Sequence, residues 1–226
     1  QVIDDVISSA FGSAGQRCSA LRVLLLPVET ASTILAGLAG AMGELDIGDP
    51  ALPDTDMGPV IDRAAHDNLQ IHLQQTTIKS GLVVQIETEQ KPGFFFGPAL
   101  VQITSLACIE REVFGPILHV LPYEAKDLDG LLEELAAKGY GLTLGVHSRI
   151  SSFAERVRQK VPVGNIYVNR SMIGAVVGVQ PFGGHGLSGT GPKAGGPHYL
   201  FRFAREQVVS VNITAQGGDP ELLNLI

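Results

Sequence analysis

Short apolar runs alternate with longer amphipathic or alanine-rich stretches along most of this 226-residue chain. A short apolar run bounded by glycine or proline is typical of a buried strand, whereas apolar residues at every third or fourth position indicate a helix. The pattern predicts strands at 21–28, 82–86, 99–103, 117–122, 142–147 and 164–169, and helices at 29–45, 62–79, 126–138 and 151–161. This alternation predicts an α/β domain with a largely parallel sheet flanked by helices.

Composition and charge exclude several classes of protein. Hydrophobic residues make up 45% of the chain, which is enough for a packed core, and the net charge of −7 argues against a nucleic-acid surface. No apolar stretch approaches the roughly 18 residues that a membrane span needs. Two cysteines form no disulfide framework, which suits a cytoplasmic location, and the six histidines show no metal-ligand spacing. We therefore expect no membrane span, no nucleic-acid contact and no metal site.

The two ends of the chain differ from the rest. Residues 1–6 begin within a helical pattern, without an N-cap or an initiator methionine, so we expect the chain to be part of a longer protein. Glycine and proline become frequent after residue 180, and a last alternating run at 207–213 suits a sheet edge or a partner chain. We expect a main domain over 1–187 and a tail over 188–226.

Cys18 is the strongest candidate for a reactive residue. It follows an amphipathic helix pattern and a turn with Gly12 and Gly15, which leave backbone N–H groups without side chains to screen them. Arg17, next to the cysteine, stays charged and favours the nucleophilic thiolate. The alternative is a buried structural cysteine, which is the interpretation that fits Cys108 in its apolar surroundings.

A second candidate site is the segment Glu112-Val113-Phe114-Gly115-Pro116. In an extended segment Glu112 and Phe114 share a face. The carboxylate can then accept hydrogen bonds from sugar hydroxyls while the ring lies against a flat heterocycle. The alternative is a surface glutamate beside a buried phenylalanine.

Two later glycine-containing segments suggest loops near a ligand. Residues 171–175 follow a predicted strand, so Gly174 and Ala175 can offer backbone N–H groups to an anion. Pro181-Phe182-Gly183-Gly184 predicts a tight loop that passes close to a ligand or to another segment. Residues 184–189 match the dinucleotide pattern G-x-G-x-x-G, but glycines and prolines follow in place of a helix, so we reject a phosphate-binding role.

Taken in order, these motifs resemble the C-terminal half of aldehyde dehydrogenases. The run 186–200 further resembles the L-glutamate γ-semialdehyde (1-pyrroline-5-carboxylate) dehydrogenase module of the bacterial proline utilization A family. In that family a separate proline dehydrogenase domain, which binds FAD, precedes this module. The resemblance implies that residues 1–187 are a catalytic domain without its N-terminal cofactor domain, and that the tail carries an oligomerisation strand at about 207–213.

The resemblance also implies a reaction and its residues. Cys18 would attack the aldehyde, a hydride would pass to NAD, and water would release glutamate from the resulting thioester. Glu112 and Phe114 would hold the nicotinamide ribose and ring. The implied substrate-binding residues are Arg17, Ser19, Gly174, Ala175 and Phe182, with Ser19, Gly174 and Ala175 at the carboxylate.

The family's general-base glutamate and oxyanion asparagine precede the catalytic cysteine, outside this chain. We therefore expect the parent protein to be an NAD-dependent dehydrogenase and a homo-oligomer, and this chain alone to be inactive. Several alternatives stay open. The substrate can be another aldehyde, the cofactor can be NADP, or the chain can be a non-catalytic assembly fragment. Another is a cysteine hydrolase in which His147, His185 or His198 is the base.

Overall fold

The computed structural model describes residues 1–79, 81–88, 92–212 and 221. Its main sheet has the strand order β1-β4-β3-β2. Strands β1 (Val23–Pro27), β4 (Ile117–Tyr123) and β3 (Ala99–Gln102) run parallel, and β2 (Gly81–Gln85) is antiparallel at one edge. Strands β6 (Thr143–Val146) and β7 (Asn165–Val168) form a separate parallel pair. The predicted α/β fold with a largely parallel sheet is confirmed.

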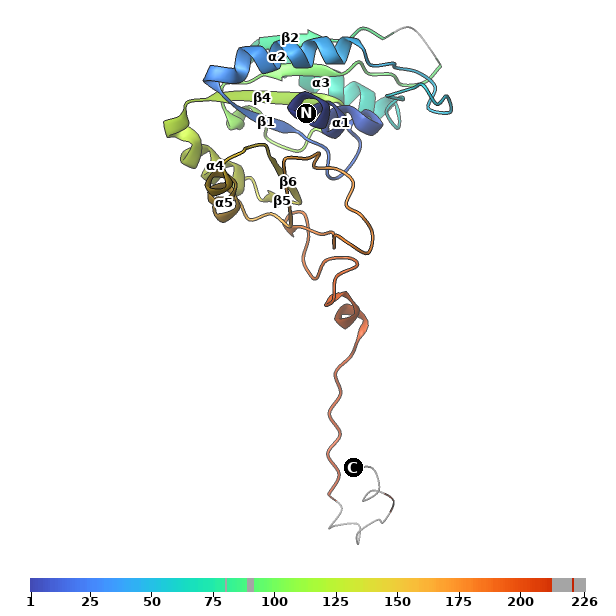
Figure 1. Ribbon diagram of the computed structural model, residues 1–226. Coiled ribbons are helices and arrows are strands. Elements are labelled where there is room, and N and C mark those ends of the chain that lie inside the picture. The colour runs from blue at the N-terminus through green and yellow to red at the C-terminus, as the bar shows by residue number, and fades with distance from the viewer. Residues whose placement is uncertain (80, 89–91, 213–220, 222–226) are drawn as a thin grey trace.

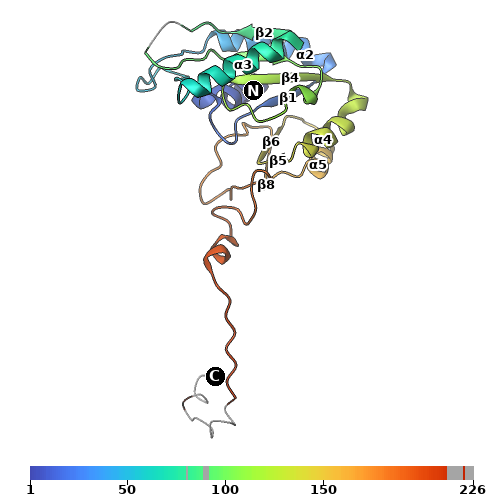
Figure 2. The ribbon, with the colours of Figure 1, turned by 180° about the vertical axis from the view of Figure 1, so that it is seen from behind.

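Helices cover both faces of the main sheet. Helices α1 (Val2–Phe11) and α2 (Val28–Gly43) lie over one face, and α3 (Arg63–Lys79) lies over the other (Figures 1 and 2). Helices α4 (Leu128–Ala137) and α5 (Ser151–Lys160) pack together beside the β6–β7 pair. This layering explains why β3 and β4 are apolar at nearly every position, since a strand covered on both faces has no solvent side.

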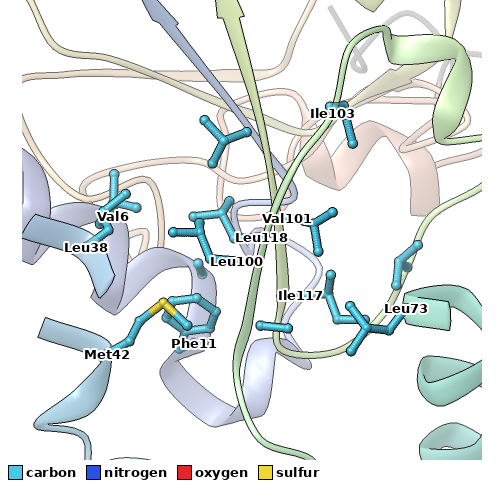
Figure 3. Packing of buried hydrophobic residues seen from close by; sticks show 14 of the residues in the cluster. Val6, Phe11, Leu38, Met42, Leu73, Leu100, Val101, Ile103, Ile117 and Leu118 are labelled. Atoms are coloured by element: carbon cyan, nitrogen blue, oxygen red, sulfur yellow. The ribbon is translucent and has the colours of Figure 1, made fainter. Parts of the chain in front are cut away.

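The main hydrophobic core lies between this sheet and the helices. Leu100, Val101, Leu118 and Val120 of the central strands have no solvent exposure. In Figure 3, Phe11 of α1 and Met42 of α2 lie on one side of these strands, and Leu73 of α3 lies on the other. A second, smaller core joins β6 to α4 and α5; its buried members are Tyr123, Leu128, Leu132, Val146, Val157 and Val161. The helix–strand alternation therefore builds two neighbouring packing units.

The predicted strands and long helices agree with the structure to within about two residues at most ends. The sequence analysis missed the 3-10 helices and the two-residue strands. These are the 3-10 helices η1 (Gly12–Gly15), η2 (Leu106–Cys108), η3 (Ala125–Asp127) and η4 (Tyr199–Phe203), and the antiparallel strands β5 (Tyr140–Gly141) and β8 (His185–Gly186). Each of these 3-10 helices is shorter than two helical turns, and each of these strands is a single strand period, so no hydrophobic period can show.

Residues 204–212 of the tail run away from the body of the molecule (Figure 1). Residues 204–212 carry exposed side chains, with Val208, Val209 and Val211 among them. Of the strand predicted at 207–213, residues 207–212 pair with no other strand in the described part of the chain, and Ile213 lies outside the described residues. None of the described helices is both long enough and apolar enough to cross a membrane.

Candidate active site

Cys18 lies just after a left-handed turn at the end of α1. Ser13, Ala14 and Gly15 have φ angles of 57°, 54° and 63°. This conformation costs a non-glycine residue about 1–2 kcal/mol, and strained backbone of this kind concentrates at functional sites. The Cys18 side chain is exposed, whereas Cys108 packs partly buried against the main core. The alternative of Cys18 as a buried structural cysteine is therefore wrong.

The neighbours of Cys18 have different environments. Arg17 is exposed, and its Nε donates to Ser13 Oγ at 3.0 Å, so this cation braces the turn that precedes the cysteine. Ser19 is buried, and its carbonyl oxygen accepts a hydrogen bond from Thr143 Oγ1 at 3.4 Å. This contact ties the Cys18 loop to β6.

Arg22, which the sequence analysis did not identify, joins the Cys18 loop to the segment 112–116. Its Nη1 donates to the carbonyl oxygens of Gly15 and, at 3.3 Å, Gly115. Its Nη2 donates to the carbonyl oxygen of Arg17 at 3.0 Å and to Glu112 Oε1 at 3.3 Å. One feature of the sequence could have identified Arg22: it is a charged residue inside the apolar run 21–28, which was predicted to be a buried strand.

Glu112 and Phe114 both face solvent-accessible cavities. Glu112 is 38% exposed at its side chain and Phe114 is 46% exposed, so the alternative of a buried Phe114 is wrong. Both residues line a cavity of about 750 Å³ against α3. They also line a groove of about 840 Å³ that contains Cys18 and Arg22. The structure thus brings the predicted nucleophile and the two predicted cofactor residues to one groove.

The loop 171–175 is anchored to α1, the helix that leads into the Cys18 turn. The Oγ atoms of Ser9 and Ser171 are 3.0 Å apart, and the backbone N–H of Met172 donates to Ser9 Oγ at 3.2 Å. Gly174 is exposed with a φ of 74°, and Ala175 is half-buried. This anchor fixes one side of the loop and leaves its glycine tip accessible.

Asn165 on β7 holds the loop that contains Phe182. Its Nδ2 donates to the carbonyl oxygen of Pro181 at 3.0 Å, and its Oδ1 accepts from the backbone N–H of Gly183 at 3.4 Å. A Cβ atom on Gly164 would lie 1.7 Å from the Gly183 carbonyl oxygen, so these two backbones touch. The loop is tight, as predicted, and Phe182 is half-buried within it.

A pair of histidines lies behind Arg22. His119 on β4 has no solvent exposure, and its Nδ1 donates to the Arg22 carbonyl oxygen at 3.1 Å. Its Nε2 is 2.8 Å from His72 Nε2, so His72 donates in this contact because His119 Nδ1 carries the proton. Burial lowers the pKa of His119 to about 4 and also lowers the pKa of His72. Both rings are therefore neutral at pH 7.

The histidines considered as hydrolase bases have other contacts. His147 Nε2 is 3.6 Å from Asp5 Oδ2, His185 lies in β8, and His198 stacks on Phe201 with ring centroids 6.2 Å apart. Within the described part of the chain, Cys18 forms no hydrogen bond with a histidine. The structure therefore does not support the cysteine hydrolase alternative.

Comparison with known proteins identifies the family. A model of the aldehyde dehydrogenase family matches residues 1–209. The chain is 53% identical over 210 residues to the bifunctional protein PutA of Klebsiella aerogenes, a match that covers 90% of this chain and 16% of that protein. It is 36% identical over 207 residues to a 1-pyrroline-5-carboxylate dehydrogenase of Geobacillus sp. strain WCH70, which covers 91% of this chain and 40% of that protein.

Solved structures show the same relationship. A crystal structure of bifunctional proline utilization A aligns with a TM-score of 0.88 and 52% identity, over 96% of this chain and 22% of that one. A Thermus 1-pyrroline-5-carboxylate dehydrogenase with bound NAD aligns with a TM-score of 0.81 and 34% identity, over 89% of this chain and 39% of that one. The chain thus spans between 16% and 40% of the length of these relatives, and it belongs to the aldehyde dehydrogenase family.

Proposed function

We propose that this chain supplies the nucleophile and part of the cofactor and substrate surfaces of an enzyme that oxidises L-glutamate γ-semialdehyde to glutamate with NAD. The observation that carries the proposal is the exposed Cys18 in one groove with Glu112 and Phe114. Relatives named PutA and 1-pyrroline-5-carboxylate dehydrogenase support the substrate class.

In the proposed reaction the Cys18 thiolate attacks the aldehyde carbon and forms a C–S bond, and the carbonyl oxygen becomes an oxyanion. The backbone N–H of Cys18 helps to hold that oxyanion. NAD, when bound, accepts the hydride that leaves this carbon. A thioester on Cys18 remains, and attack by water breaks its C–S bond, which releases glutamate and the free thiol.

The residues of segment 112–116 fit the nicotinamide end of NAD. Glu112 accepts one bond from Arg22 at Oε1, and a carboxylate has two oxygens, so acceptor capacity remains for ribose hydroxyls. The exposed ring of Phe114 offers an apolar surface to a flat heterocycle. The NAD-bound Thermus relative supports this cofactor.

For the substrate, we propose that Ser19, Gly174 and Ala175 hold the distal carboxylate and that Arg17 and Phe182 complete the binding surface. Backbone N–H groups at a glycine tip present donors without steric cover, which suits an anion. The anchoring of loop 171–175 to α1 by Ser9 supports a fixed geometry for these donors.

The remaining parts of the proposal concern the whole enzyme. We propose a catalytic domain over 1–187 and a tail over 188–226 that makes a homo-oligomer through about 207–213, where exposed valines offer an apolar strand to a partner. FAD would bind only to a separate proline dehydrogenase domain of the parent protein. We propose that the parent protein is located in the cytoplasm. The second candidate function, a non-catalytic assembly fragment, has the same exposed valines in its favour.

The polypeptide of these 226 residues is expected to show no steady-state oxidation of the semialdehyde, because the resemblance to aldehyde dehydrogenases implies that the general base and the oxyanion asparagine lie outside these residues. The measurement is NADH formation at 340 nm, with an intact 1-pyrroline-5-carboxylate dehydrogenase as the positive control. Turnover within tenfold of that control would contradict this part of the proposal.

Cys18 is expected to react with iodoacetamide at least tenfold faster than Cys108 at pH 7.5, because the first thiol is exposed and the second packs against the core. Peptide mass spectrometry follows both sites in the same sample, so Cys108 is an internal control. Equal and slow rates at the two sites would count against Cys18 as the nucleophile.

A further inference from the structure

We infer that Arg22 is the positioning residue of this site: it fixes the loop that carries Cys18 against the segment that carries Glu112 and Phe114, and its charge, not that of Arg17, supports the Cys18 thiolate. This inference rests on the proposed function and adds to it a residue that holds the nucleophile in register with the cofactor residues. It follows from the contacts of one guanidinium.

The four N–H groups of the two Arg22 Nη atoms are divided between the two segments. Each Nη donates once to the Cys18 loop, at the carbonyl oxygens of Gly15 and Arg17, and once to segment 112–116, at Gly115 and Glu112. The guanidinium also lies over the ring of Phe114, 4.8 Å from its centroid. Each Nη therefore bridges the two segments.

Only an arginine can make this set of contacts. Its planar fork holds donors in fixed directions, whereas a lysine ammonium places three donors at a single point. The segments are otherwise in direct backbone contact, because a Cβ atom on Gly15 would lie 2.3 Å from the Gly115 carbonyl oxygen. The arginine thus fastens two backbones that already touch.

The electrostatic part of the inference compares two cations. Arg22 is mostly buried, with 16% of its side chain exposed, and it lines the groove that contains Cys18. Burial lowers the pKa of Arg22, while Glu112 and the Cys18 thiolate raise it. Arg17 is exposed and is bonded to Ser13 Oγ. Since solvent screens an exposed charge more strongly than a buried one, Arg22 is the more effective partner of the thiolate.

The backbone of Arg22 is also fixed. Its carbonyl oxygen accepts hydrogen bonds from the backbone N–H and from Nδ1 of His119, both at 3.1 Å. His119 is in turn bonded to His72 on α3. The side chain is therefore projected from a rigid point on the sheet, which is what a positioning residue requires.

The test is the pH profile of Cys18 alkylation in the 226-residue chain, followed by peptide mass spectrometry in Arg22→Met, Arg22→Lys and, for comparison, Arg17→Met. Arg149→Met, at an exposed arginine outside the proposed site, is the control. Arg22→Met is expected to slow Cys18 alkylation at pH 7 about tenfold and to move the profile to higher pH, because the thiolate loses its cation. Arg17→Met is expected to move the profile less than Arg22→Met does, and Arg149→Met is expected to change the rate less than twofold. Arg22→Lys is expected to keep the profile, since the charge remains.

Hydrogen exchange distinguishes the role of the forked hydrogen bonds of Arg22 from the role of its charge. Peptides that contain 12–19 and 112–116 are expected to exchange faster in both Arg22 variants, and the 112–116 peptide is expected to be unchanged in Arg17→Met. If Arg22→Met does not fold, Cys108 will react as fast as Cys18 in that variant. Hydrogen exchange of the 112–116 peptide in Arg22→Lys and in Arg17→Met then tests the role of Arg22.

The outcomes distinguish the two levels of the proposal. Slow alkylation of Cys18 in the unaltered chain would overturn the proposed function. Two other results would overturn the role of Arg22 alone. In the first, Cys18 alkylation is fast in the unaltered chain, but Arg17→Met moves its pH profile more than Arg22→Met does. In the second, hydrogen exchange of the 12–19 and 112–116 peptides is unchanged in Arg22→Lys.

Discussion

Lowering the pH from 7 to 4 is expected to remove about 3 kcal/mol of the free energy of unfolding through one buried histidine, His119. This ring has no solvent exposure, and burial lowers its pKa to about 4 from an ordinary value of 6.5. Each pKa unit corresponds to about 1.36 kcal/mol, and the difference spans about two and a half units. The sheet that carries the site is therefore sensitive to acid at its centre.

The direction of the effect follows from proton binding. Between pH 4 and 6.5 the unfolded chain protonates this histidine, while the folded chain keeps it neutral. The unfolded state then binds more protons, so stability rises with pH across this range. The contribution is complete above pH 6.5 and is lost as the pH falls toward 4. His72, whose pKa is lowered by burial and by Arg111, adds to the effect in the same direction.

Urea unfolding at several pH values measures the effect in the unaltered chain and in His119→Asn. The asparagine keeps a donor for the Arg22 carbonyl oxygen but does not titrate, so its stability is expected to change less between pH 6.5 and 4. His198→Asn is the matched control, because His198 is exposed and is expected to leave the acid sensitivity unchanged. An equal loss of stability in the unaltered chain and in His119→Asn would contradict the assignment to His119.

The sequence was sufficient to predict the layers of the fold. Strands β3 and β4 are apolar on both faces, and the helices between strands show a clear period, so local patterns carried the information. The antiparallel direction of β2 was not predicted, because its five residues carry no mark of strand direction. Strands β5 and β8 were missed because pairs of two residues have no period.

Local sequence suggested candidate site residues where chemistry is concentrated in a short motif. Cys18, Glu112 and Phe114 were identified from their immediate neighbours, and the structure brings them to one groove. Arg22 was not identified, because its role depends on Glu112, a residue 90 positions away. The same holds for the pair of His72 and His119, which only the packing of α3 against the sheet brings together.

The left-handed turn before Cys18 was also only partly predictable. Gly15 signals a positive φ, but nothing in the local sequence predicts that Ser13 and Ala14 share it. The turn also brings the backbone of Gly15 against that of Gly115, a contact between residues 100 positions apart in the sequence. Strain of this kind comes from tertiary structure and so is invisible to local propensity.

Replacing Gly15 with alanine is expected to lower the free energy of unfolding by about 3 kcal/mol or more. The new Cβ atom would lie 2.3 Å from the Gly115 carbonyl oxygen and 2.9 Å from that of Ala10, and neither backbone atom can rotate away. Overpacking costs about 1–3 kcal/mol, and the φ of 63° adds about 1–2 kcal/mol for an alanine.

Gly12→Ala is the matched control, since it makes the same change in the same turn. Its φ is −52°, and its new Cβ atom would meet only Ile173 Cδ1, at an ordinary contact distance of 3.8 Å. Thermal unfolding of both variants is expected to show a lower Tm for Gly15→Ala and little change for Gly12→Ala. Because Gly15 and Gly115 both accept from Arg22, Gly15→Ala is also expected to slow Cys18 alkylation at pH 7. Equal Tm values for the two variants would show that this backbone contact does not hold the loop in place.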